Sequence, residues 1–362
     1  MRPNFGVTFA TLLVLVAVAP VGVAASPTVQ TDDCSFPYTA TDASGTEVTL
    51  EERPERVTTL NPSAAQTMWA LDAEAQVVGR TQFAAYLEGA DSKTNVSKAG
   101  GFGASVEKVV GTEPDLVLAP NTTSRETVKQ LRDAGLTVFV FSTATSLEDV
   151  AEKTTTIGRL TGNCQAAART NAWMTANVEA AREATADAER PSVLYPLGGG
   201  YVANTGTFIS TMLEASGGTN AMAEANVSQP YPQVNDETIV DLAPEVIVTT
   251  DSNRYLLEQE PYASTPAVEN NRTVDVDVNY LNQPAPRSVV YSVQNLTMGL
   301  HPDVEASWVA KSEISLTTAT DDAPTETFTA TPSGSPTEGS GVGFGLVAAL
   351  LALTGLGLVV RE

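Results

Sequence analysis

The sequence predicts an α/β fold with two similar parallel-sheet lobes, joined by one long helix and separated by a ligand cleft. Residues 107–119 recur in altered form as residues 237–249. In each copy an acidic residue opens a short amphipathic helix, a proline seven residues later ends it, and a branched-aliphatic run predicts a buried parallel strand. Between the copies, residues 165–190 are rich in alanine and contain no glycine or proline. Two facing lobes form a cleft, and such clefts bind small ligands.

The first lobe is expected at residues 56–160, after an N-terminal segment (26–55) that contains a hairpin. The hairpin is predicted because residues 38–50 alternate around an Asp42-Ala-Ser-Gly turn. Strands that alternate with helices indicate a parallel sheet covered on both faces. The expected strands are 56–60, 77–79, 115–119 and 137–141, and the expected helices are 64–71 after the Asn61-Pro-Ser cap, the helix opened by Glu107, 125–134 and 147–160.

The linker is placed at residues 161–190, because Gly162 interrupts the preceding helix. As a helix, the stretch 165–190 would measure about 39 Å at 1.5 Å per residue. The second lobe is expected at 191–310 and repeats the plan of the first. Its expected strands are 192–197, 245–249 and 273–278, and its expected helices are 207–215, the helix opened by Glu237, and 288–300.

The N-terminus predicts export. Residues 1–25 have the pattern of a secretory signal peptide, because Arg2 precedes an apolar run that ends in small residues. A retained N-terminal anchor is the alternative.

The C-terminus predicts attachment to the outer face of the cell membrane. Residues 311–340 are expected to form a stalk, since from Leu316 onward they are almost all Thr, Ser, Pro, Ala, Gly and acid. Residues 341–362 hold an apolar run closed by Arg361, which predicts a membrane anchor with its end inside the cell. The start of this run, Gly341-Val-Gly-Phe-Gly, resembles the C-terminal sorting signals of haloarchaeal surface proteins, with a valine in place of their proline.

The charge balance excludes nucleic acid as a partner. The chain has 20 Lys and Arg against 43 Asp and Glu, a net charge of −23. Binding to phosphates requires a basic face. An acidic excess of this size is typical of a halophilic surface, where high salt screens the repulsion, and simple acidic solubility is the alternative.

Cys34 and Cys164 are the only cysteines, and in an exported chain they most simply form a disulfide. A lipid on Cys34 is the alternative, disfavoured by the polar residues before it. With a single histidine, His301, the chain lacks the ligands of a zinc or manganese site. Five glycosylation sequons fit an exported surface: Asn95, Asn121, Asn226, Asn271 and Asn295.

Three stretches resemble, in order, the helical-backbone class of ABC-importer substrate-binding proteins, and within it the cobalamin-binding type. They are Arg56-Val-Thr-Thr-Leu-Asn-Pro-Ser, Glu107 with the later Pro-Asp-Leu-Val, and Tyr231-Pro-Gln-Val-Asn-Asp-Glu with the later Pro-Glu-Val-Ile-Val. The resemblance covers residues 46–303. It implies one rigid linker helix, lobes that rock little, permease and ATPase partners, and cobalamin as bound ligand with no cofactor.

The resemblance also implies roles for particular residues. In relatives, the glutamates that open the two repeat helices pair with arginines of the permease, which makes Glu107 and Glu237 candidate docking groups. The alternative is that each only stabilises its helix N-terminus, by about 0.3–1 kcal/mol. The candidate ligand-binding residues are Ser63, Gln82, Phe83, Tyr86, Phe102, Tyr201, Tyr231, Asn279 and Gln283.

The candidate ligand-binding residues suit a flat macrocycle fringed with amides, since aromatic faces stack on it and amides bond to it. Two positions depart from the family pattern: Gln82 and Gly101 stand where relatives have aromatics. An iron–siderophore or haem complex is therefore the alternative ligand.

Two rival classes can be weighed from the sequence. Gly198-Gly-Gly-Tyr-Val-Ala formally matches a dinucleotide fingerprint, but His301 ends the last helix and no catalytic triad can be built on it. We therefore expect no enzyme. A passive surface spacer would suit the stalk, yet it would not need a duplicated lobe. Thermal stabilisation by a ligand separates a binder from a spacer.

Overall fold

The computed structural model describes residues 29–30 and 34–317 of the 362-residue chain. The predicted signal peptide, most of the predicted stalk and the predicted membrane anchor lie outside these residues and stay predictions. Within the described ranges, no helix combines the length and the apolar character needed to cross a membrane.

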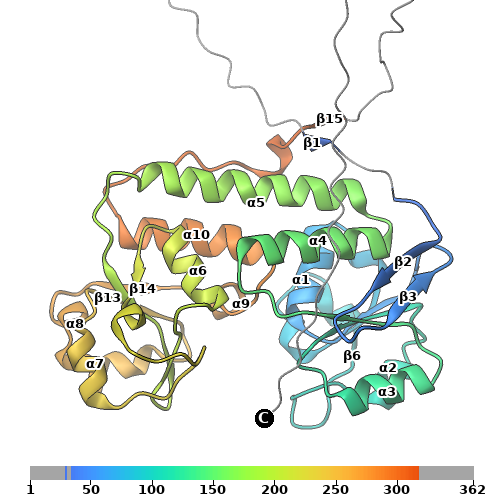
Figure 1. The fold of residues 1–362 in the computed structure, drawn as a ribbon, viewed down its shortest axis with the longest axis horizontal. Helices are drawn as coiled ribbons and strands as arrows, with labels where there is room; N and C mark the ends of the chain where they lie inside the picture. The colour runs from blue at the N-terminus through green and yellow to red at the C-terminus, as the bar shows by residue number, and fades with distance from the viewer. Residues whose placement is uncertain (1–28, 31–33, 318–362) are drawn as a thin grey trace, which may run out of the picture. The chain divides into compact units, whose positions relative to one another are not determined.

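The first lobe is built around a five-stranded sheet in the order β6-β5-β4-β7-β8, with every neighbouring pair parallel (Figure 1). Its strands are β4 (Val57–Thr59), β5 (Val77–Arg80), β6 (Thr94–Asn95), β7 (Leu116–Pro120) and β8 (Val138–Phe141). Its helices are α1 (Pro62–Ala70), α2 (Val106–Val110), α3 (Arg125–Asp133) and α4 (Leu147–Thr161). Apart from the short edge strand β6, these are the predicted elements, with ends shifted by a few residues.

Helices cover both faces of this sheet, because alternate residues of a strand point to opposite sides. Leu116 and Leu118 of β7 pack in one core cluster with residues of α1 and α4. Val117 and Ala119, between and after them, pack in another cluster with residues of α2 and α3. All four side chains are buried, as expected for a central parallel strand.

The predicted hairpin is confirmed and is fastened to the first lobe by a buried carboxylate. Its antiparallel strands are β2 (Tyr38–Thr41) and β3 (Glu47–Leu50). Asp42 in the turn pairs with Arg132 of α3 at 2.6 Å and accepts the N–H of Val140 in β8. Burial alone would raise the pKa of Asp42, but hydrogen bonds from the turn and from β8 hold it below its ordinary value.

The second lobe has a four-stranded parallel sheet in the order β12-β9-β13-β14. Its strands are β9 (Ser192–Leu194), β12 (Thr219–Asn220), β13 (Val246–Thr249) and β14 (Thr273–Asp275). Its helices are α6 (Phe208–Ala215), α7 (Asp236–Leu242), α8 (Pro266–Glu269), α9 (Val278–Leu281) and α10 (Pro286–Leu300).

Two of the predicted strands of the second lobe were too long. The strand predicted at 192–197 ends at Leu194, and the antiparallel pair β10 (Pro196–Gly198) and β11 (Tyr201–Val202) follows it, because a proline cannot donate to a central ladder. The strand predicted at 273–278 ends at Asp275. Helix α9 begins at Val278 instead, since the Asp277 side chain accepts the N–H of Asn279 as an N-cap.

The linker is helix α5 (Cys164–Ala184), which runs alongside both lobes (Figure 1). It is about 31 Å long at 1.5 Å per residue, shorter than the 26-residue helix predicted to reach 190. The helix ends at the C-cap Thr185, whose backbone leaves helical geometry. The Thr185 side chain packs against Gly217 of the second lobe, where a Cβ on the glycine would lie 2.8 Å from the threonine Cβ.

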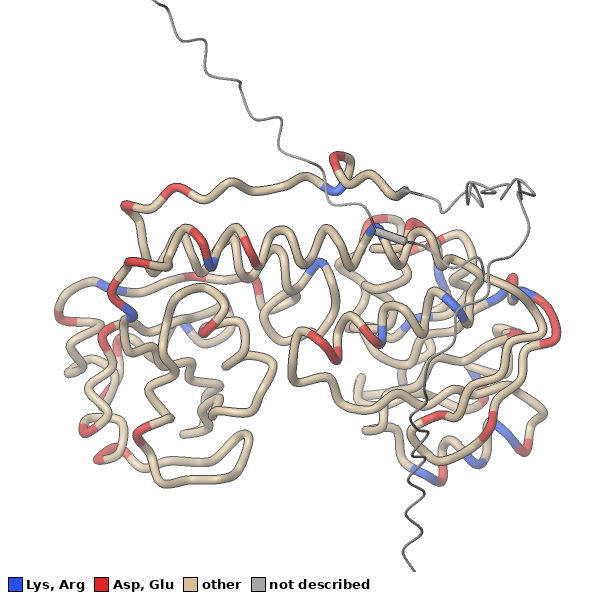
Figure 2. The backbone as a smooth tube through the Cα atoms, turned by 45° about the horizontal axis from the view of Figure 1, so that its top comes forward, with Lys and Arg blue, Asp and Glu red and all other residues tan. Residues whose placement is uncertain are grey.

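A second connection between the lobes was not predicted. After α10, residues 302–317, the return segment, run back along α5 toward the first lobe, as the views of Figures 1 and 2 both show. Asn177 of α5 donates to the carbonyl of Val309, Lys311 pairs with Asp72, and β15 (Leu316–Thr317) pairs with β1 (Val29–Gln30). Ile314 is buried in the core. The stalk therefore cannot begin at 311 or at Leu316, because these residues belong to the fold.

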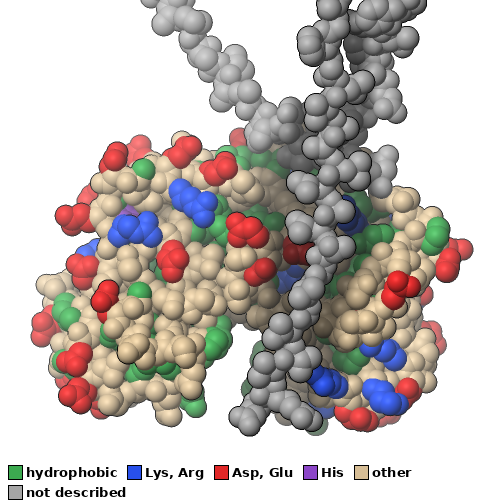
Figure 3. All heavy atoms as spheres, in the orientation of Figure 1, with side chains coloured by type: hydrophobic (Ala, Val, Ile, Leu, Met, Phe, Trp, Pro, Cys, Tyr) green, Lys and Arg blue, Asp and Glu red, His purple; other side chains and the backbone are tan. Residues whose placement is uncertain are grey.

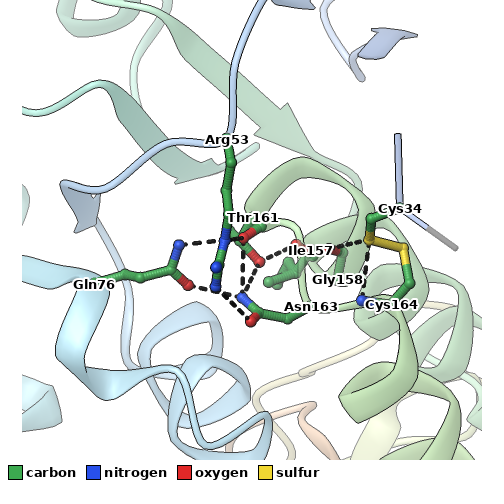
Figure 4. Close-up of a disulfide and its surroundings, with 8 residues drawn as sticks. All are labelled: Cys34, Arg53, Gln76, Ile157, Gly158, Thr161, Asn163 and Cys164. Atoms are coloured by element: carbon green, nitrogen blue, oxygen red, sulfur yellow. Dashed lines mark hydrogen bonds between the residues drawn. A yellow bond between two sulfur atoms is a disulfide. The ribbon is translucent and has the colours of Figure 1, made fainter. Parts of the chain in front are cut away.

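The predicted disulfide between Cys34 and Cys164 is present and ties the N-terminal segment to the start of α5 (Figure 4). The Cys34 sulfur accepts the N–H of Cys164 at 3.0 Å and lies 3.4 Å from the carbonyl oxygen of Gly158. Beside it, Arg53 donates to the carbonyl of Thr161 and to the side chain of Asn163. These bonds hold the N-terminal segment against the turn between α4 and α5.

Candidate functional site

A cavity of about 800 Å³ opens between the two lobes, in the hollow seen in Figure 3. The first lobe contributes Thr143, Ala144 and Thr145, and the second lobe contributes the remaining walls. The lining includes the larger side chains of Leu197, Phe208, Gln229, Tyr231 and Asn282. No charged residue of the described chain lines this cavity, although the net charge of the whole chain is −23.

The topology of the two sheets explains the position of the cavity. Thr143–Thr145 follow the carboxyl end of β8, and Leu197 follows that of β9. Loops at the carboxyl ends of parallel strands are where α/β folds bind ligands. Sequence analysis missed Thr143–Thr145, although they directly follow the strand predicted at 137–141, and it placed Leu197 inside the strand predicted at 192–197.

Residues 278–284, the interlobe segment, lie between the cavity and the first lobe. On the cavity side, Asn282 accepts the hydroxyl hydrogen of Tyr195 at 3.2 Å, and Pro284 also lines the wall. Asn279 and Gln283, two of the predicted ligand residues, lie on this segment and are half-buried, but neither lines the cavity. The interlobe segment thus forms part of the cavity wall and also contacts the first lobe.

Ser63 does not present a free hydroxyl to the cleft. Its side chain is buried, donates to the carbonyl of Pro284 at 2.6 Å and accepts from Lys153 Nζ at 2.6 Å. Lys153 of α4 also donates to the same carbonyl. Part of the Lys153 side chain reaches the surface, but its ammonium group is enclosed by these partners. This burial lowers the pKa of Lys153 to about 7, although the nearby Asp149 carboxylate acts to raise it.

The buried ammonium group of Lys153 predicts a pH dependence. The folded pKa of about 7 lies below the ordinary value of 10.5, so between these values the unfolded chain binds more protons than the folded one. The free energy of unfolding should therefore rise with pH across this window. Urea unfolding at pH 7, 8 and 9 should show a steeper rise for the wild type than for Lys153→Met. Equal slopes would show that the ammonium group is not desolvated.

The predicted aromatic residues fall into separate groups. Phe83 and Phe102 of the first lobe lie with ring centroids 5.7 Å apart and are 45% and 82% exposed. Tyr86 instead contacts Tyr280 of the interlobe segment, edge to face at 6.1 Å. In the second lobe Tyr231 lines the cavity and is 48% exposed.

Two further predicted residues lie outside the cavity lining. The Gln82 side chain lies against Gly101, where a Cβ would come within 1.9 Å of its amide nitrogen. Tyr201 forms a backbone bridge with Gln233. Of the nine predicted ligand residues, only Tyr231 therefore lines the 800 Å³ cavity.

The two candidate docking glutamates, Glu107 and Glu237, occupy equivalent positions. Glu107 is the second residue of α2, after the N-cap Ser105, and Glu237 is the second residue of α7, after the N-cap Asn235. Both side chains are exposed, and neither has a hydrogen-bond or ion-pair partner in the described chain. The sequence repeat is therefore also a repeat in structure, with an exposed carboxylate at the same helix position in each lobe.

The sequence profile of the periplasmic binding protein family matches residues 57–280. The chain belongs to this family. A cobalamin-binding protein of Halobacterium salinarum is 46% identical over 303 residues, which cover 80% of this chain and 82% of the relative. The uncharacterized ABC transporter substrate-binding lipoprotein YvrC of Bacillus subtilis is 30% identical over 320 residues, which cover 84% and 99% of the two chains.

Solved structures share the fold of this periplasmic binding protein. The periplasmic heme-binding protein RhuT of Roseiflexus sp. RS-1, in apo form, has a TM-score of 0.61 at 24% identity and covers 68% of this chain and 99% of its own. The two-lobed α/β prediction is confirmed by this likeness. Membership of the family also confirms that the chain is a carrier and not an enzyme, and that it works outside the cytoplasmic membrane with ABC transporter subunits.

Proposed function

We propose that this periplasmic binding protein captures cobalamin or a related corrinoid between its lobes and delivers it to the permease of an ABC importer. The observation that carries the proposal is the 46% identity, over 80% of the chain, to a protein named for cobalamin binding. A relative this similar over both lobes shares the elements that surround the cleft.

The chemistry of the cavity supports a large, uncharged ligand. Tyr231 and Leu197 offer apolar faces on which a macrocycle can lie, and the amides of Gln229 and Asn282 offer donors and acceptors for its fringe. Since no charged residue of the described chain lines the cavity, affinity would come from contact area and hydrogen bonds, not from ion pairs.

The proposal assigns Glu107 and Glu237 to docking on the permease. Both carboxylates are exposed and unpaired, at the same position of the two lobes, and neither lines the cavity. A partner with two equivalent halves would meet the same group on each lobe. Partner arginines would pair well with such carboxylates, because the guanidinium fork matches their geometry.

Calorimetric titration of the purified protein in high salt tests the ligand. We expect cyanocobalamin to bind one-to-one, and a ligand concentration of one hundred times Kd should stabilise the fold by about 2.7 kcal/mol. Tyr231→Ala should weaken binding, and Tyr255→Ala, which removes a comparably exposed tyrosine outside the cavity lining, should not. Tight binding of haem or a ferric siderophore without corrinoid binding would replace the proposed ligand with the alternative one.

A further inference from the structure

A buried glutamine of the first lobe forms hydrogen bonds to the second. Gln66 of α1 is fully buried. Its Nε2 donates to the Tyr86 hydroxyl at 2.7 Å and to the carbonyl of Asn279 at 3.4 Å. Its Oε1 accepts from the N–H of Ser288 at 2.9 Å and from the Ser288 hydroxyl at 3.0 Å. A glutamine amide can make four hydrogen bonds in this way, two as donor and two as acceptor, and here all four are made.

Gln66 supplies the N-cap hydrogen bond that helix α10 cannot form with its own N-cap residue. The N-cap of α10 is Ala285, whose side chain cannot accept a hydrogen bond. Ser288 is the third residue of the helix, and an N-cap side chain ordinarily accepts from this position. The cap of this second-lobe helix therefore comes from a residue more than 200 positions away in the first lobe.

The face of α1 that carries Gln66 forms further hydrogen bonds to the second lobe and to the linker helix α5. Ser63, one turn earlier, donates to Pro284. The carbonyl of Trp69 accepts from Arg287, and that of Ala70 accepts from Thr170 of α5. Residues three apart on a helix share a face. Gln66 thus lies in the middle of a row of contacts that joins α1 to the second lobe and to the linker helix.

The groups held by Gln66 lie next to the cavity wall and do not line it themselves. Tyr86 is oriented by the bond to Nε2, and Tyr280 of the interlobe segment packs on its ring. Asn279 is held through its carbonyl, and the same segment supplies Asn282 and Pro284 to the cavity wall. Burial raises the pKa of Tyr86 to about 12, and the hydrogen bond from Gln66 opposes this rise.

We infer that Gln66 is a positioning residue of the ligand site, which caps α10 from the opposite lobe and thereby fixes Tyr86 and the interlobe segment beside the cavity. The inference rests on the proposed function for its binding readout. A wall that is fixed before the ligand arrives lowers the entropy lost on binding, and so increases affinity without a contact between Gln66 and the ligand.

The test is a double-mutant cycle on cyanocobalamin binding. Gln66→Met keeps the shape and removes all four bonds, and we expect it to weaken binding about tenfold, comparable to the loss of one or two hydrogen bonds. Tyr86→Phe should weaken binding in the wild type but add little in the Gln66→Met background, because the tyrosine is then already released. The matched control is Gln130→Met, an exposed glutamine of α3 that bonds only within its helix.

Two outcomes would overturn the inference. One is a folded Gln66→Met protein with wild-type affinity, and the other is strict additivity of the two substitutions, which would leave Gln66 a role in stability alone. Hydrogen exchange of the Ser288 amide provides a readout without ligand, and it should become faster in Gln66→Met and not in Gln130→Met. If the wild type fails to bind corrinoid, the proposed function fails, and this exchange measurement still decides whether Gln66 caps α10.

Discussion

The double variant Glu107→Gln, Glu237→Gln should bind ligand with wild-type affinity and fail to support uptake. Both carboxylates are exposed, unpaired and absent from the cavity lining, so their loss leaves the ligand site intact. If the permease supplies a cation for each, the variant loses two charge-assisted contacts, and at about 1.5–3 kcal/mol each this amounts to at least a hundredfold in docking. Uptake of labelled cobalamin in whole cells, with calorimetry on the purified variant, measures the two effects separately.

A charge-matched control for this double variant is available near the same two helices. Glu113→Gln with Asp241→Asn removes the same net charge from exposed positions that follow Glu107 in the first lobe and Glu237 in the second. This control should import normally if docking depends on the two equivalent glutamates and not on rim charge in general. Normal uptake by the Glu107 and Glu237 variant would reduce both residues to helix-end stabilisers, worth about 0.3–1 kcal/mol each.

Removal of the disulfide with Cys34→Ala and Cys164→Ala should lower the free energy of unfolding by up to about 5 kcal/mol. The bond closes a loop across 130 positions, and the chain-entropy treatment gives its largest effects for long loops. A loss of this size is a large fraction of the stability of an ordinary domain. Urea unfolding under oxidising conditions, for the wild type and the double variant, measures the difference.

Reductant supplies the control for the disulfide. Dithiothreitol should shift the unfolding midpoint of the wild type toward that of the double variant and leave the variant itself unchanged. Two free thiols by mass spectrometry in protein secreted under oxidising conditions, or a wild-type midpoint that ignores reductant, would contradict the prediction. The N-terminal segment would then be held only by its noncovalent contacts around Arg53.

Local signals in the sequence were sufficient for most of the fold. The repeat predicted α2 and β7 in the first lobe and α7 and β13 in the second, and Gly162 ends α4 in the left-handed conformation that favours glycine. The hairpin turn at Asp42 and the disulfide were also predicted correctly. Each of these depends on a few adjacent residues or on the export of the chain, so it can be recognised without knowing what packs where.

The site was predicted less well, for a physical reason. Ser63 was expected to face the ligand, yet it bonds to Pro284, and the cap of α10 comes from Gln66. Residues 311–317 of the return segment were assigned to the stalk because the sequence that follows is polar, whereas in the fold Ile314 is buried. Periodicity, caps and turns act between neighbours in sequence, so the sequence alone determined the elements and their order. Contacts between residues more than 200 positions apart form only when the two lobes dock, so the tertiary structure alone decided which side chains face the cleft and which hold the lobes together.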